Sequence, residues 1–420
     1  MRRRQFLLTG SSALVALRVD GEVPRSASSK DSPGQRVAGP MHPPSTIVGE
    51  WNNALLSAAR KETTAPCLVA LKLAVLHKAI HLGLADDAST HPPFASVQAA
   101  LTIASSLYPS AEASFREIAV KQFSGMKSNP RKADALARGA KLANSILEER
   151  KGDGASTSQP YIPSDKPGQW RRTPPAMRPP ELPHWAKVTK PFLLESAEQF
   201  RPPPPPALAS AEYARAWDEV RRLGSKNSTE RTADQTTAAH FWSDFSYTET
   251  PPGHWNSLAR SLTQRRNMPL AEEARLFFLL NASLADAAIA CWDAKYHYNT
   301  WRPVTAIVRA TEDGNEGTAP ESDWQSLLGI PPHPEYVSGH STFSGATAEV
   351  LRHHFGTDKL SFDVTSDTLK DTKRGFKCLD ACVQEISNSR IWGGIHFPFS
   401  CNAGVTLGRV VANECLRKAL

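Results

Sequence analysis

Residues 160–206 contain 14 of the 33 prolines of this 420-residue chain, and the stretch ends in five consecutive prolines, Pro202 to Pro206. Proline lacks a backbone N–H and clashes with the preceding helical turn, so this stretch cannot form long helices. We therefore predict an extended segment that wraps the surface of the protein. Its aromatic residues Trp170, Trp185 and Phe192 indicate that the segment docks on the rest of the chain.

The sequence on both sides of this segment has helical periodicity. From about Ile47 to Gly152, apolar residues recur at the three-to-four spacing of a buried helix face. Periodicity returns at Ser210, and its strongest run, Leu270 to Tyr298, is rich in Ala and Leu. No strand-like alternation persists and no internal repeat is visible. We predict an all-α fold.

The predicted organisation has four parts. Residues 1–45 form an export signal and tail, residues 46–152 an N-terminal helical region, residues 153–207 the proline-rich connection, and residues 208–420 a C-terminal catalytic helical domain. The chemistry-bearing residues described below fall in the last part.

The N-terminus looks like a twin-arginine export signal. Arg2-Arg3-Arg4-Gln5-Phe6-Leu7-Leu8 is followed by the apolar stretch Ala13 to Leu17. Gly10-Ser11-Ser12 interrupts the apolar region and no clear cleavage site follows, so a basic tail without a targeting role is the alternative. Export would place the protein in the periplasm or outside the cell.

The charge, the apolar runs and the cysteines limit which partners, membrane spans and disulfide bonds the chain can have. The formal charge is +7, but residues 1–45 hold seven Lys/Arg against three Asp/Glu, which leaves +3 for the rest. We therefore expect no nucleic-acid partner. No uninterrupted apolar run approaches the roughly 18 residues of a transmembrane helix, so we predict no membrane span. Six scattered cysteines favour buried free thiols, with one bridge between Cys378 and Cys382 left open.

Two short segments suit an oxyanion. Lys295 and Arg302 are seven residues apart, which is two helical turns, so both could face one ligand if the helix continues to Pro303. Ser338-Gly339-His340 is a glycine turn followed by helical periodicity. Such a turn presents backbone N–H groups and the positive end of the helix dipole to an anion.

A third segment completes the set. Ser389-Arg390 precedes His396, and Gly393-Gly394 between them would let the backbone turn sharply, so that the guanidinium and the imidazole converge. In this order and spacing, the three segments resemble the signature shared by vanadium-dependent haloperoxidases and type-2 phosphatidic acid phosphatases. The similarity to bacterial vanadium-dependent haloperoxidases extends over residues 50–420.

The resemblance implies a helical protein that holds vanadate in a phosphate-type pocket. Hydrogen peroxide would oxidise halide there to a hypohalous equivalent, which halogenates a small organic acceptor. The groups that would bind the vanadate oxygens are Lys295, Arg302, Ser338, Gly339 and Arg390. His396 would be the vanadium ligand. His340 would take a proton from peroxide, and Lys295 would polarise the peroxide.

Three further residues enter through the same resemblance. Trp292 matches a position on the halide side of the pocket in chloride-oxidising members. His333 matches a position that is histidine in algal bromide-oxidising members and phenylalanine in fungal chloride-oxidising ones, so the halide stays open. Asp234 is a candidate for the carboxylate that holds His340 through its far nitrogen.

Two residues depart from the family pattern. Val337 stands where proline usually precedes Ser-Gly-His, and Ser400 stands where an aspartate usually orients the ligand histidine. A serine can accept the N–H of His396 but supplies no charge, so we expect weaker vanadate binding. Asn402, or a buried carboxylate elsewhere, is the alternative source of that acceptor.

Two other functions remain open. One is an acid phosphatase, in which His396 attacks phosphorus and His340 protonates the leaving group. The other is an anion-binding homologue that has lost turnover through Ser400. Trp292, His333 and the N-terminal half favour the peroxidase. Ser400 disfavours the phosphatase, because a nucleophilic histidine depends more heavily on its orienting carboxylate. The sequence leaves the acceptor and the oligomeric state open, a homo-oligomer included.

Overall fold

The computed structural model describes residues 46–85, 92–127, 129–157 and 159–419. The predicted export signal lies outside these residues. The helices are α1 Ile47–Lys61, α2 Pro66–Leu84, α3 Pro92–Leu107, α4 Glu112–Gly125, α5 Lys132–Glu149, α6 Ala211–Gly224, α7 Ala233–Phe241, α8 Thr250–Arg265, α9 Leu270–Tyr298, α10 Pro303–Val308, α11 Gly339–Phe355, α12 Leu379–Trp392 and α13 Pro398–Ala419. Shorter elements are the 3-10 turns η1 Pro109–Ala111, η2 Trp185–Lys187 and η3 Ala310–Glu312, and the strands β1 Phe362–Thr365 and β2 Lys373–Phe376. The all-α prediction is confirmed.

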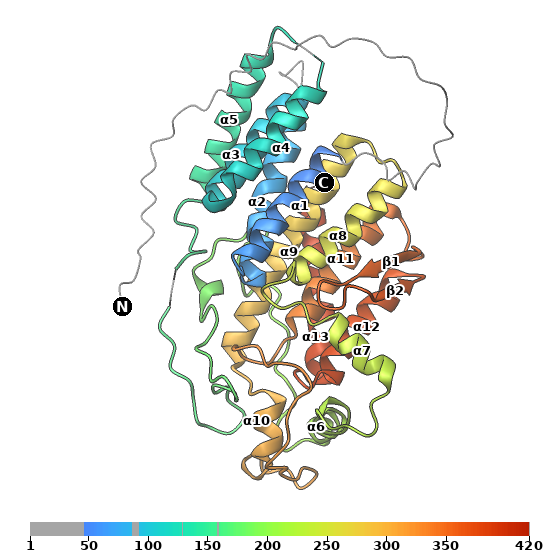
Figure 1. The fold of residues 1–420 in the computed structure, drawn as a ribbon. Helices are drawn as coiled ribbons and strands as arrows, with labels where there is room; N and C mark the ends of the chain where they lie inside the picture. The colour runs from blue at the N-terminus through green and yellow to red at the C-terminus, as the bar shows by residue number, and fades with distance from the viewer. Residues whose placement is uncertain (1–45, 86–91, 128, 158, 420) are drawn as a thin grey trace, which may run out of the picture.

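Helix α9 is the centre of the molecule and spans the run from Leu270 to Tyr298 that the sequence predicts. It lies between the blue N-terminal helices and the red C-terminal helices (Figure 1) and contacts α1, α2, α8, α11 and α13. One hydrophobic cluster runs from Val48 in α1 to Leu416 in α13. The N-terminal and C-terminal helical parts therefore share a single core, and the predicted domain boundaries stay predictions.

Two core helices, α2 and α9, are long and apolar enough to cross a membrane by length and composition alone. In the folded chain, 67% of the apolar window of α2 and 89% of that of α9 are buried inside the protein. The prediction of no membrane span missed these windows because single polar residues interrupt the apolar runs, whereas the mean hydropathy over 18 residues stays high. Burial accounts for that hydropathy in a core helix.

Helices α11 and α13 pack with their backbones in close approach. A Cβ atom built on Gly408 of α13 would lie 2.1 Å from the carbonyl oxygen of Thr342 in α11, so only glycine fits there. At the start of α11 the backbone N–H of Ser338 donates to the carbonyl oxygen of Ser400 at 3.1 Å. This packing fixes the Ser338 turn against the start of α13, and His396 lies two residues before that helix begins.

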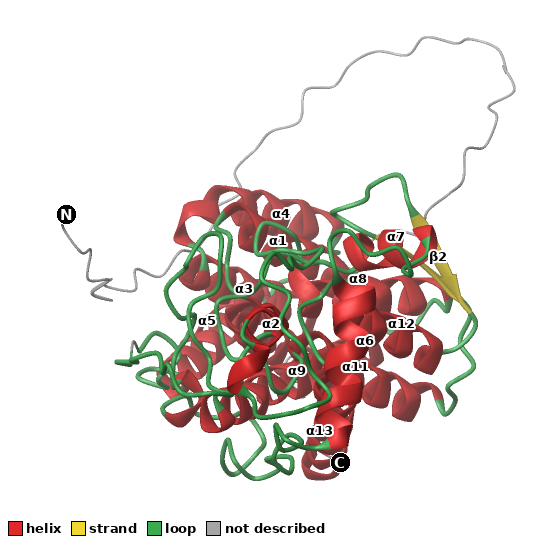
Figure 2. Cartoon of the chain, turned by 90° about the horizontal axis from the view of Figure 1, so that it is seen from below, coloured by secondary structure: helices red, strands yellow, loops and turns green. Residues whose placement is uncertain are grey.

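The proline-rich connection docks on α9, as the sequence predicts. The carboxylate of Asp286 accepts the backbone N–H groups of three consecutive residues, Phe192, Leu193 and Leu194, at 2.6, 2.7 and 2.9 Å. Trp170 and Trp185 are fully buried. Outside η2 the described residues of this connection form no helix, and loops cross the face of the helical body seen in Figure 2. The connection is therefore packed firmly against the helical body.

The structure adds a short antiparallel hairpin that the sequence pattern does not predict. Phe362 of β1 pairs with Phe376 of β2, and the hairpin lies at the rim of the molecule beside α7 (Figure 2). The strands have four residues each, too short for an alternation that stands out in the sequence. All six cysteines are free, and five of them are buried.

We expect Asp286→Asn to loosen the proline-rich connection. The amide NH₂ would face at least one backbone N–H donor, and a buried donor left without an acceptor costs about 1–3 kcal/mol. Urea unfolding should show this loss, and limited proteolysis should cut within residues 153–207 sooner. Asp371→Asn, at an exposed position, is the control. Equal protease resistance of the two variants would show that Asp286 does not hold the connection.

Candidate active site

Residues of the second and third sequence segments line one cavity of about 250 Å³, and Arg302 of the first segment contacts His333 and His396 in its wall. It lies where the C-terminal end of α9, the N-terminus of α11 and the end of α12 meet. Its lining includes Trp292, His333, Gly339, His340, Phe343, Arg390 and His396. Residues that lie more than 100 positions apart in the sequence therefore share one site.

Three cationic side chains, Lys295, Arg302 and Arg390, are fully buried at this site. Burial lowers the pKa of Lys295 to about 8 and the pKa values of Arg302 and Arg390 to about 10 each. Among the described residues, no carboxylate oxygen lies within 4 Å of the charged nitrogens of these three side chains. A cluster of desolvated positive charge without a paired carboxylate is a strong attractor for an anion.

Backbone carbonyls, and not carboxylates, hold the first two cations. The ammonium group of Lys295 donates to the carbonyl oxygens of Pro334 and Glu335 at 3.0 Å each. Helix α9 ends at Tyr298, so it does not continue to Pro303. Asn299 adopts the left-handed conformation at φ 53°, and the chain beyond it carries Arg302 back toward the cavity.

A single glycine makes the sharp turn that brings Arg390 and His396 together. Gly394 has φ +73°, and a Cβ atom on it would lie 2.3 Å from the carbonyl oxygen of Gly224. Gly393 ends α12 in the ordinary right-handed region. Of the two glycines in this segment, only Gly394 has a backbone conformation that requires glycine.

The hydrogen bonds of His396 define its tautomer. The guanidinium of Arg302 lies 3.2 Å from Nε2, and because a guanidinium can only donate, Nε2 is the acceptor. The neutral ring then carries its proton on Nδ1, which lies 2.8 Å from Oε1 of Glu335. Burial, with Arg302 and Lys295, lowers the pKa of His396 well below its usual value. The site therefore presents a neutral imidazole whose Nε2 lone pair is met by the Arg302 guanidinium, so an incoming ligand of Nε2 would replace that hydrogen bond.

Glu335 corrects the expectation drawn from Ser400. The carboxyl group of Glu335 is fully buried and accepts both the Nδ1–H of His396 and the backbone N–H of Phe397, at 2.8 and 3.0 Å. Ser400 lies 3.5 Å from Nδ1, and Asn402 is exposed. His396 thus has a carboxyl acceptor after all, and burial raises the pKa of that carboxyl group to about 7. The only signal in the sequence is an isolated glutamate in the His333-Pro334-Glu335 run, and the sequence motifs did not point to it.

His340 faces a guanidinium and a carboxylate with the same nitrogen. Its Nε2 lies 3.3 Å from Arg390 and 3.9 Å from Oδ2 of Asp244. Burial and Arg390 lower the pKa of His340 well below its usual value, so the ring is neutral and Nε2 can accept a proton. Once protonated, the ring would find the Asp244 carboxylate close by.

The prediction that Asp234 holds His340 is wrong. Asp234 lies in the first turn of α7 with its side chain 73% exposed, and it pairs with Arg374 at 2.9 Å. It sits in the capping turn of a surface helix, where a carboxylate suits the helix dipole. Asp244, ten residues later, is the carboxylate beside His340, and nothing in the sequence distinguished the two.

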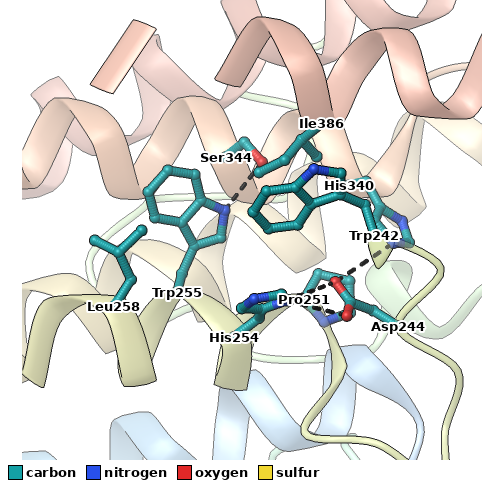
Figure 3. A pocket seen from close by; sticks show the side chains of 9 residues that line it. All are labelled: Trp242, Asp244, Pro251, His254, Trp255, Leu258, His340, Ser344 and Ile386. Carbon is teal, nitrogen blue, oxygen red and sulfur yellow. Dashed lines mark hydrogen bonds and ion pairs between the residues drawn. The ribbon is translucent and has the colours of Figure 1, made fainter. Parts of the chain in front are cut away.

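Asp244 is shared by two histidines. Figure 3 shows it between His340 and His254, whose Nδ1 lies 3.1 Å from Oδ1. Burial alone would lower the pKa of His254, but the charge and hydrogen bond of Asp244, with Glu249, outweigh it and raise the pKa to about 9. His254 is therefore protonated at neutral pH, and its charge balances Asp244 while His340 is neutral.

Trp292 and His333 lie together in the cavity wall, with ring centroids 4.8 Å apart. His333 accepts a hydrogen bond from Arg302 through Nδ1 at 3.0 Å, and burial lowers its pKa well below the usual value. The indole N–H of Trp292 is buried and has no acceptor in the part of the chain that the structure describes. An unpaired buried donor in a cavity wall can bind an anionic ligand.

The Ser338-Gly339 turn opens α11 beside these groups. Ser338 caps the helix, since its hydroxyl accepts from the backbone N–H of Ser341. Gly339 is the first helical residue and lines the cavity. The first N–H groups of a helix have no partner within it, so this turn can offer them to an anion, as predicted.

The chain is similar to known proteins in sequence and in fold. Residues 275–420 match the family described as the VCPO second helical-bundle domain. The vanadium chloroperoxidase of Curvularia inaequalis is 28% identical over 200 residues, which are 41% of this chain and 32% of that protein. This chain therefore matches only about a third of the length of that relative.

Solved structures cover nearly the whole chain. A structure described as the first bacterial vanadium-dependent iodoperoxidase has a TM-score of 0.77 and 28% identity, over 90% of this chain and 97% of that one. An apo-type bacterial vanadium-dependent chloroperoxidase has a TM-score of 0.68 and 17% identity, over 84% of this chain and 92% of that one. The second likeness shows the fold alone.

We expect His254→Gln to destabilise the protein more in mild acid than in alkali. The folded-state pKa of about 9 lies above the ordinary 6.5, so protonated His254 stabilises the fold fully below pH 6.5, and the contribution is lost as the pH rises through 9. The pH-dependent part is on the order of 3 kcal/mol. Urea unfolding at both ends of this range, with exposed His297→Gln as control, measures it. A loss independent of pH would mean that His254 is neutral.

Proposed function

We propose that this chain, a relative of the vanadium-dependent haloperoxidases by sequence and by fold, binds vanadate and uses hydrogen peroxide to oxidise halide. The product would be a hypohalous equivalent that halogenates a small organic acceptor. The observation that carries the proposal is the set of three buried cations, without carboxylate ion pairs among the described residues, beside His396, whose Nε2 lone pair faces the guanidinium of Arg302.

The residues of the cavity fit a tetrahedral oxyanion. Arg302 and Arg390 would donate to its oxygens. The ammonium group of Lys295 already donates to the carbonyl oxygens of Pro334, Glu335 and Val337, so Lys295 would add its positive charge or exchange one of these bonds for a bond to the anion. The hydroxyl of Ser338 and the N–H of Gly339 would add neutral donors at the helix terminus. His396 would ligate vanadium through Nε2. Bound vanadate supplies a Lewis-acidic centre at which peroxide becomes electrophilic toward halide.

His340 is the residue that we assign to proton transfer. Its neutral Nε2 is available to take a proton from hydrogen peroxide, and Arg390 beside it disfavours the charged ring until that proton arrives. Asp244 then stabilises the imidazolium. Since His254 already balances the charge of Asp244, the carboxylate attracts this proton less than an unpaired one would, which helps the ring to release it.

The wall of Trp292 and His333 is the proposed place for halide. The indole N–H without an acceptor is a donor for an anion, and the neutral His333 accepts a hydrogen bond from Arg302 in the same wall. Which halide is oxidised does not follow from these contacts. The proposal includes export to the periplasm or the outside of the cell, and it rests there on the N-terminal sequence alone.

The structure changes the argument against the phosphatase alternative. Ser400 counted against a nucleophilic histidine because no orienting carboxylate was visible. Glu335 removes that objection, and it equally removes the reason to regard the site as impaired. The relatives, together with the donor of Trp292, favour halide oxidation.

We expect orthovanadate to restore activity to phosphate-treated protein, and excess phosphate to compete with it, because both oxyanions would occupy the same three cations. The measurement is halogenation of monochlorodimedone with peroxide and iodide, bromide or chloride. Activity that survives exhaustive dialysis against phosphate and chelator would contradict a vanadate cofactor.

The two site histidines should fail in different ways. His396→Ala should abolish turnover and reduce vanadate affinity to that of phosphate, since only the covalent ligand is lost. His340→Ala should keep vanadate affinity but lower turnover by roughly 10²–10⁴-fold, the usual contribution of a general acid–base group. Calorimetry and the halogenation assay test this, with exposed His297→Ala as control. Equal loss of vanadate affinity in both variants would refute the division of roles.

A further inference from the structure

The far side of His396 carries the most unusual contact of the site. Glu335 is 0% exposed, and a carboxylate buried to that degree is costly unless it is paired. One of its oxygens, Oε1, receives both the Nδ1–H of His396 and the backbone N–H of Phe397. The other oxygen, Oε2, has no partner in the described part of the chain. The whole hydrogen-bonding use of this carboxyl group is thus directed at His396 and the residue after it.

The other ring nitrogen of His396, Nε2, explains why the contact of Glu335 with Nδ1 matters. Imidazole has one lone pair when neutral, and the contact with Arg302 requires it at Nε2. An acceptor at Nδ1 enforces that tautomer, because the proton must then reside on Nδ1. A carboxylate also raises the donor strength of the ring more than a neutral acceptor does.

We propose that Glu335 is the positioning residue for His396, fixing it as an Nδ1–H tautomer whose lone pair is on Nε2, the nitrogen that Arg302 contacts. This inference rests on the proposed function, since it concerns the bond from Nε2 to vanadium. Glu335 makes no contact with the ligand itself and acts through the ring.

The surroundings of Ser400 support an exchange of carboxylate position. Ser400 lies on the same side of the ring, 3.5 Å from Nδ1, and its hydroxyl donates toward the carbonyl oxygen of Glu335 at 3.4 Å. An aspartate at position 400 would place a second buried carboxylate next to Glu335, and two such charges repel. A small neutral side chain at 400 is what a glutamate at 335 requires.

Two oxyanions separate positioning from general packing. Vanadate would bond to Nε2, whereas phosphate at rest would be held only by the cations and the N–H donors. Loss of Glu335 should therefore weaken vanadate binding by about 10–100-fold. It should leave phosphate binding unchanged or tighter, because one negative charge near the anion is gone. A purely structural loss would weaken both.

The test is calorimetric titration of the full apo-protein with orthovanadate and, separately, with inorganic phosphate. Glu335→Gln and Glu335→Ala are the variants, and retained phosphate binding shows that the pocket is still folded. Glu181→Gln removes another carboxyl group from the cavity wall, so it should change both affinities by the same factor. Nitrogen-15 NMR of His396 in the apo-protein should show the proton on Nδ1 in the unchanged chain.

The outcomes are distinguishable. If the unchanged chain prefers vanadate strongly over phosphate but both Glu335 variants keep that preference, the positioning role is wrong and the proposed function stands. If the unchanged chain does not distinguish the two oxyanions, the proposed function fails and this inference fails with it.

A relocated carboxylate gives the sharpest check. The double variant Glu335→Ala with Ser400→Asp should recover vanadate preference over the single Glu335→Ala variant, because it returns a charged acceptor to Nδ1. Ser400→Asp alone should bring no gain, since Glu335 already occupies that role. Tighter vanadate binding by Ser400→Asp alone, or no recovery in the double variant, would overturn the proposal.

Discussion

Burying three cations in one place is the constraint on which the rest of this structure depends. Lys295, Arg302 and Arg390 are removed from water without a carboxylate to pair with in the described ranges, which costs several kcal/mol for each charge unless fixed dipoles or an anion compensate. Backbone carbonyls supply part of that compensation. A rigid core must hold them, and α9, packed on five other helices, provides it.

The two histidines of the site obtain different properties from similar surroundings. Each ring has one nitrogen that accepts from a guanidinium, and each is kept neutral by burial and by that positive charge. They differ in their carboxylates. Glu335 bonds directly to the far nitrogen of His396 and fixes its tautomer. Asp244 lies 3.9 Å from the working nitrogen of His340 and is balanced by His254, so that His340 is left free to gain and lose a proton.

Much of this arrangement was predictable from the sequence, because helices follow local periodicity and the site motifs are short. The limits of α9 and the docking of the proline-rich connection followed from local patterns, whereas the meeting of the three motifs followed from their resemblance to the haloperoxidase signature. The carboxylates did not. Asp234 and Asp244 are ten residues apart, Asp234 in a polar stretch and Asp244 among aromatic residues, and the end of α7 between them decides which one faces His340. Glu335 reaches His396 across 61 positions, a contact that depends on how tightly α11 packs on α13.

The central claim is that the three segments form a single vanadate site with His396 as the ligand. A crystal structure of the protein soaked in orthovanadate tests it most directly. We predict vanadium bonded to Nε2 of His396, oxygens in contact with Lys295, Arg302 and Arg390, and the Nδ1 contact to Glu335 preserved. Vanadate bound elsewhere, or held in the cavity without a bond to His396, would contradict it.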